Sequence, residues 1–161
     1  MANLKRTLAL VLAVIMLVGM MAISAGAAFP DADKIQYPEA AAVMEAAGVI
    51  GGDENGNYLP EKILDRAEAA TMITRLIGMG NASGKSTFTD IVGEYAWADS
   101  YVAVAEAEGI VAGNGDGTFS PEGTLTGYAW AKMLLCATGY DADQEGLKGA
   151  GWETNVYKLM K

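Results

Sequence analysis

Few residues in this chain could bind or transform a ligand, and Arg66 is the most unusual of them. It lies in the stretch 64–70, which predicts a helix start with Asp65 as the N-cap and Glu68 three residues later. The helix dipole disfavours a cation at that end, but free backbone N–H groups beside a guanidinium form a good receptor for a carboxylate or phosphate. The alternative is structural: an ion pair of Arg66 with Glu68 or with an acid of the other copy of the repeat described below.

Two glycine-rich patterns suggest phosphate or calcium binding, but their spacing is wrong. The stretch 80–86 has three residues between its glycines where a phosphate-binding loop needs four, and it follows a predicted helix rather than a strand. Calcium loops counted from Asp53 and Asn114 would place Leu64 and Leu125 where a bidentate glutamate is required. We interpret these stretches as a linker and two structural turns, with adventitious calcium binding as the alternative for the turns.

The composition excludes most catalytic designs. The chain has no histidine, which removes Ser-His and Cys-His catalysis and the usual histidine-ligated zinc sites. The only cysteine, Cys136, falls in an apolar helical pattern and is predicted to be a buried thiol. Asp53 and Glu54 are adjacent in a predicted turn, so they are poorly placed to act as a glycosidase pair. We predict no enzymatic activity, no cofactor and no metal site.

A segment of about sixty residues occurs twice and supplies the elements that position these residues. Gly48 and Pro60 recur as Gly109 and Pro121, at a constant offset of 61. Each copy predicts a helix, a glycine-rich loop and a second helix, so the chain is predicted to be all-α. The tail, 140–161, repeats the apolar spacing of a first helix and is interpreted as the start of a third copy. The predicted boundaries are 28–80, 81–139 and 140–161.

Residues 1–27 predict a cleaved signal peptide. Lys5 and Arg6 precede an uncharged apolar run at 8–23, and a small-x-small site follows at 25–27. The alternative is an uncleaved membrane anchor, but the run spans only about 24 Å, which is less than the roughly 30 Å membrane core. Its removal takes the formal net charge from −9 to −11, because two cations and no acids leave. An acidic exported chain predicts no nucleic-acid partner and no membrane contact after cleavage.

The ordered motifs of the repeat resemble the S-layer homology (SLH) domain. The family pattern is Phe-x-Asp, Gly-Ile-x-x-Gly, Asp-Gly-x-Phe-x-Pro and Thr-Arg-Ala-Glu. The first copy matches it with Phe29-Pro30-Asp31, Gly48-Val49-Ile50-Gly51-Gly52, Asn55-Gly56-Asn57-Tyr58-Leu59-Pro60 and Leu64-Asp65-Arg66-Ala67-Glu68-Ala69-Ala70. The resemblance covers 29–161 and implies a pseudo-threefold helical prism whose third repeat is incomplete.

The resemblance also implies a function and a site. SLH domains anchor exported proteins non-covalently to the bacterial cell wall, through a pyruvylated secondary cell-wall polysaccharide or through peptidoglycan. The family arginine meets the acidic ligand, which favours ligand binding at Arg66. The expected site residues are Arg66, Asp65, Glu68, Asp31, Trp97 and Trp130. For Asp31 a turn or N-cap role is the alternative, and for Trp130 the alternative is core packing.

The second copy departs from the pattern at its second helix. Gly127 stands in place of the arginine and Ala129 in place of the glutamate, so this copy is predicted to lack the charged anchor. In the first copy, Asp65 replaces the family threonine and adds a negative charge beside the expected ligand.

Three hypotheses follow for the whole chain. The leading one is a secreted, non-enzymatic wall-binding module located at the cell wall or cell surface. The second is an assembly module that associates with another chain through its incomplete third repeat. The third is an N-terminal fragment of a larger surface protein or enzyme.

Overall fold

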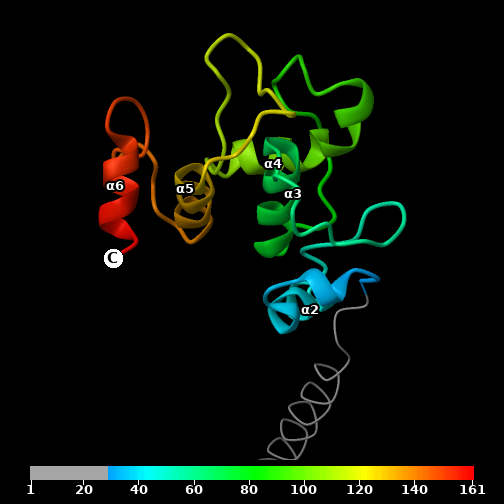
Figure 1. Cartoon of the computed structure of the whole chain (residues 1–161). Helices are drawn as coiled ribbons and strands as arrows, with labels where there is room; N and C mark the ends of the chain where they lie inside the picture. The colour runs from blue at the N-terminus through cyan, green and yellow to red at the C-terminus, as the bar shows by residue number, and fades with distance from the viewer. Residues whose placement is uncertain (1–28) are drawn as a thin grey trace, which may run out of the picture. The chain divides into compact units, whose positions relative to one another are not determined.

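The computed structural model describes residues 29–161, so the predicted signal peptide lies outside the described residues. Within this range the chain is helical and contains no named β-strand, which confirms the all-α prediction (Figure 1). None of the described helices is long and apolar enough to cross a membrane. The elements are η1 (Ala32–Lys34), α2 (Pro38–Ala46), α3 (Arg66–Leu76), η2 (Gly93–Ala98), α4 (Asp99–Ala107), α5 (Gly127–Ala137) and α6 (Trp152–Leu159).

The chain divides into two compact units, up to Pro60 and from Glu61 onward. The first unit holds η1, α2 and the loop after α2. Its small core consists of Phe29, Ile35 and Ala41. The Tyr58 ring packs on Phe29 with the ring centroids 5.3 Å apart. The division at Pro60 differs from the repeat boundary predicted after residue 80, and that boundary stays a prediction.

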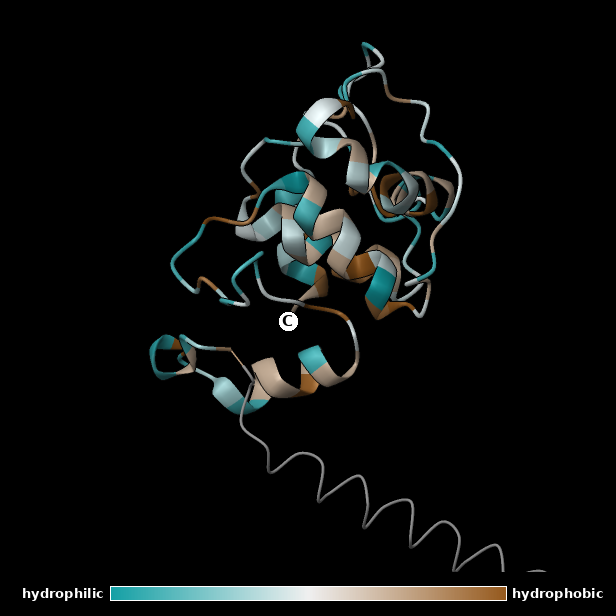
Figure 2. Cartoon of the chain, turned by 90° about the vertical axis from the view of Figure 1, so that its right-hand side faces the viewer, coloured by the Kyte–Doolittle hydropathy of each residue, from teal (hydrophilic) through white to brown (hydrophobic). Residues whose placement is uncertain are grey.

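The second unit contains α3 to α6 around one larger core. Helix α3 packs against α4 and α5, and α6 packs against α5 (Figure 1). Polar and apolar residues alternate along these helices (Figure 2), and the apolar ones supply most of the core. The fully buried members include Ile73, Val102, Ile110, Phe119 and Leu147.

An aspartate near the start of each repeat holds the loop of the same repeat. Asp31 accepts hydrogen bonds from the backbone N–H groups of Tyr58 and Leu59, at 2.8 and 2.9 Å. In the second repeat, Asp90 accepts from Phe119 and Ser120, at 2.8 and 2.7 Å. Leu59 and Ser120 both have positive φ, a conformation that disfavours residues with a Cβ atom. The carboxylates therefore stabilise a strained turn at the same place in both repeats.

Candidate functional site

Arg66 is the first residue of α3, and the loop of the second repeat covers the backbone there. The N–H of Arg66 donates to the carbonyl of Gly123 and that of Ala67 to Pro121, both at 3.0 Å. The next N–H, that of Glu68, donates to the Asp65 carboxylate at 2.8 Å. The expectation of free N–H groups at this helix start is therefore wrong, because all three already have partners.

The Arg66 guanidinium reaches across to the same loop. Nε donates to the carbonyl of Phe119 at 2.9 Å, and Nη2 donates to that of Ala112 at 3.1 Å. The guanidinium carbon lies 4.5 Å from the centroid of the Phe119 ring, which is a cation–π distance. Arginine has five N–H donors, so these two bonds leave three for another acceptor.

The charge of Arg66 is not neutralised by an ion pair. The salt bridges among residues 29–161 join Lys62 to Glu68 and Lys148 to Asp143, so the structural alternative of an ion pair between Arg66 and Glu68 is wrong. Burial lowers the pKa of Arg66, and the charge of Asp90 opposes this shift. An arginine nevertheless stays protonated at physiological pH, so the half-buried guanidinium is a positive centre held by neutral carbonyl groups.

Asp65 and Glu68 lie close to Arg66 in sequence and cap the start of the same helix. The Asp65 carboxylate caps the backbone of Glu68, and Glu68 Oε2 accepts from the backbone N–H of Asp65 at 3.2 Å. This is the predicted capping box, and the structure confirms it. Burial raises the pKa of Asp65, and the nearby charge of Glu68 adds to the shift. Both carboxylates thus fix the helix start, and their direct contact with a ligand stays a prediction.

The other predicted site residues are placed as follows. Asp31 lies in the first unit, where it holds its own loop. Burial raises the pKa of Asp31, but the N–H donors of Tyr58 and Leu59 outweigh it and hold that pKa below its ordinary value. Trp97 lies in η2 and is half exposed. Trp130 lies on α5, partly buried against the main core. The ring that the structure places at the Arg66 guanidinium is Phe119.

Sequence reasoning missed the loop residues that hold Arg66. Neither Phe119 nor Gly123 is among the site residues expected from the sequence. A Cβ on Gly123 would lie 3.0 Å from Cδ of Arg66 and from the carbonyl oxygen of Ser120, so a larger residue would press on the arginine stem. The available signal was the comparison of copies: Gly123 corresponds to Lys62, and Arg66 corresponds to Gly127. At one helix start the loop residue is glycine and the helix residue is arginine. At the other, the loop residue is lysine and the helix residue is glycine.

Within residues 29–161 no cluster of three or more histidine, cysteine or acidic side chains is arranged to hold a metal ion. Cys136 is buried, as predicted, and burial raises the pKa of its thiol.

Comparison with known proteins assigns the fold and the motifs. The model of the S-layer homology domain matches residues 28–70 and 87–127. An S-layer protein of Bacillus anthracis is 31% identical over 116 residues, which are 71% of this chain and 13% of that protein. The surface-layer 125 kDa protein of Lysinibacillus sphaericus is 35% identical over 126 residues, 77% of this chain and 10% of that protein.

An uncharacterized cell wall amidase of B. anthracis is 30% identical over 87 residues, 53% of this chain and 16% of that protein. The chain thus spans only about a tenth to a sixth of the length of these relatives. The matches support a cell-surface or cell-wall location and a general role in wall attachment. With its repeats, its helical fold and its two matched segments, the chain belongs to the S-layer homology domain family.

Proposed function

We propose that this chain attaches an exported protein non-covalently to the bacterial cell wall by binding an acidic glycan at Arg66. The observation that carries the proposal is the half-buried guanidinium, which has two carbonyl partners and no ion pair among the described residues. The charge of Asp90 acts on this guanidinium without forming a salt bridge, so the guanidinium keeps N–H donors for an anionic ligand.

The remaining donors of Arg66 suit a planar carboxylate. A guanidinium and a carboxylate can form two parallel hydrogen bonds, which give orientation as well as affinity. A pyruvylated secondary cell-wall polysaccharide carries such carboxylates on its sugars, and peptidoglycan carries them on its peptides. The bonds to Phe119 and Ala112 hold the guanidinium in advance, so less side-chain entropy is lost on binding.

The test is co-sedimentation of residues 28–161 with purified cell walls. Arg66→Lys keeps a positive charge but lacks the planar fork, and we expect at least about a tenfold loss of affinity. Arg66→Gln removes the charge as well and should bind more weakly still. Arg75→Gln is the matched control, because it removes an arginine from the other end of the same helix. Circular dichroism verifies that each variant keeps its helical content.

Three wall preparations distinguish the ligands: intact walls, walls stripped of secondary polysaccharide, and polysaccharide freed of pyruvate. Loss of binding on removal of pyruvate identifies the ketal carboxylate, whereas full binding to stripped walls identifies peptidoglycan. Equal binding by wild type and by a folded Arg66→Gln variant would remove Arg66 from the site. Absence of binding to every preparation would refute the function.

A second candidate is that the chain is the attachment segment of a longer surface protein or enzyme. The supporting observation is that the matched segment makes up only 10–16% of the S-layer and amidase relatives quoted above. Mass spectrometry of the protein extracted from its own cells tests this. A mass equal to that of residues 28–161 would contradict the second candidate.

A further inference from the structure

The start of α5 is the counterpart of the Arg66 site in the second repeat, and its backbone is uncovered. Thr126 caps the N–H of Ala129 at 3.1 Å. The N–H groups of Gly127 and Tyr128 have no hydrogen-bond partner among residues 29–161. A Cβ built on Gly127 would meet no atom within 4 Å, so the space above this residue is open.

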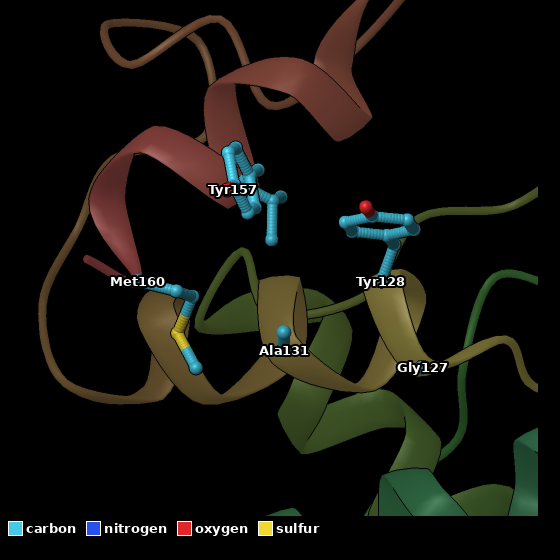
Figure 3. A pocket seen from close by; sticks show the side chains of 6 residues that line it. Gly127, Tyr128, Ala131, Tyr157 and Met160 are labelled. Atoms are coloured by element: carbon cyan, nitrogen blue, oxygen red, sulfur yellow. The ribbon is translucent and has the colours of Figure 1, made fainter.

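A groove of about 400 Å³ lies beside this helix start, between α5 and α6. Figure 3 shows the ring of Tyr128 on α5 and that of Tyr157 on α6 bordering the same space, with Ala131 and Met160 nearby. The side chains of Tyr128, Tyr157 and Met160 are about half exposed. The groove is therefore an apolar surface next to two unsatisfied donors.

The first helix start shows what covers such a surface in this fold. The loop 112–125 lies on the start of α3, where the carbonyls of Pro121 and Gly123 accept from the first two N–H groups of the helix. An isolated antiparallel bridge between Asp65 and Thr124 continues this pairing. A loop of this type is thus the natural occupant of the start of α5.

The chain itself carries a second loop of this type, residues 51–64. At the offset of 61, Pro60 corresponds to Pro121 and Lys62 to Gly123. At the covered site Gly123 faces Arg66, and a Cβ there would lie only 3.0 Å from Cδ of the arginine. At the open site Gly127 has no side chain, so there is room for a loop that carries Lys62 instead of glycine. At each site, therefore, a residue with a long side chain would face a glycine.

Charge and exposed apolar area favour the same occupant. Loop 51–64 carries Asp53, Glu54 and Glu61 against one Lys62, and its Ile63 is 68% exposed. The C-terminal end of α6 carries cations, and Lys161 Nζ lies 4.5 Å from the Tyr157 ring at the groove. An acidic loop with an exposed isoleucine therefore suits an apolar, aromatic groove that has lysines beside it at the end of α6.

We propose that a second copy of this chain docks its loop 51–64 on the groove between α5 and α6. In the complex, the N–H of Gly127 donates to the carbonyl of Lys62 in the other chain of the dimer. The N–H of Tyr128 donates to the carbonyl of Pro60 in that same chain. Ile63 of the other chain packs against Tyr128 and Tyr157. Each copy has one loop and one groove, so a twofold dimer uses both twice. The inference is independent of the glycan site at Arg66.

The test is sedimentation equilibrium of residues 28–161 over a wide concentration range. Wild type is expected to form dimers. Gly127→Arg fills the open space at the start of α5 with a side chain and places a cation against Lys62. The dimer dissociation constant should therefore rise at least about tenfold. The double variant Gly127→Arg with Lys62→Gly recreates the Arg66–Gly123 pairing and should restore association. Gly80→Arg, which adds the same charge at an exposed glycine outside the groove, is the matched control.

The design keeps the proposal falsifiable even if Gly127→Arg perturbs folding, because rescue by Lys62→Gly requires the two positions to meet. Wild type that stays monomeric at all concentrations overturns the proposal. A dimer that Gly127→Arg leaves unchanged overturns it too, as does a double variant that is folded but monomeric. A monomer whose Tyr128 and Tyr157 NMR signals shift on addition of wall fragments would assign the groove to a glycan instead.

Discussion

Replacing Arg66 by methionine tests whether this residue also joins the two repeats mechanically. Methionine keeps much of the apolar stem but removes both hydrogen bonds to the second-repeat loop and the contact with the Phe119 ring. The variant should therefore be folded but less stable, whether or not a ligand is present.

The size of the effect follows from these contacts. Two hydrogen bonds at about 1 kcal/mol each and a partly exposed cation–π contact of about 0.5–1 kcal/mol give a loss of roughly 3 kcal/mol. Removing a half-buried charge returns some desolvation free energy, of order 1 kcal/mol. The net loss is about 2 kcal/mol, which corresponds to a fall in Tm of about 6–10 °C for a chain of this size.

The assay is urea unfolding followed by circular dichroism, with Arg75→Met as the control. Arg75 has only a long 3.5 Å bond to the Tyr101 hydroxyl and a 5.1 Å ring contact, so its loss should cost well under 1 kcal/mol. A double-mutant cycle of Arg66→Met with Phe119→Leu should give a coupling of about 0.5–1 kcal/mol. A loss below about 0.5 kcal/mol for Arg66→Met would refute the idea that this arginine holds the repeats together.

Two further predictions concern the loops. The pKa of Asp31 is lowered by its backbone donors despite burial, so its stabilising effect is complete above the ordinary value near 4 and is lost as the pH falls through the lowered folded value. Asp31→Asn should remove this part of the acid sensitivity, and amide exchange of Tyr58 between pH 2 and about 5 measures it; an unchanged pH profile would contradict the assignment. Gly113→Ala should destabilise the fold by about 1–3 kcal/mol, because its Cβ would lie 2.3 Å from the Phe88 ring. Gly127→Ala places its Cβ in open space and should not destabilise the fold. Thermal unfolding compares the two variants, and equal effects would contradict the packing argument.

The local features of the fold were predictable because they depend on neighbours in sequence. Asp65 and Glu68 are three residues apart, and their spacing alone identifies a capping box. The partners of Arg66 lie 46 and 53 residues away, so their identity depends on how one repeat docks on the next. The sequence supplied an anomalous cation at a helix start but no means of knowing that backbone carbonyls would surround it.

The aromatic residues show the same difference between features set by nearby residues and contacts made across the fold. Phe119 comes two residues after Gly117, as Tyr58 does after Gly56, and this repetition alone indicates a structural role in the loop. Trp130 was expected to contact the ligand, with core packing as the alternative, and the structure places it partly buried against the main core. Helical spacing tells which residues share a face, but not which of them a neighbouring helix will cover.

The aspartates that hold each loop have a consequence for how the chain folds. The bonds from Asp31 and Asp90 close segments of 27 to 30 residues within one repeat, whereas the Arg66 bonds span 46 and 53 residues. Shorter closures lose less chain entropy, and local contacts form sooner on average. Each repeat is thus expected to close on itself first and to dock second. Arg66 acts late in this order, because its bonds join helix α3 of the first repeat to the loop of the second repeat.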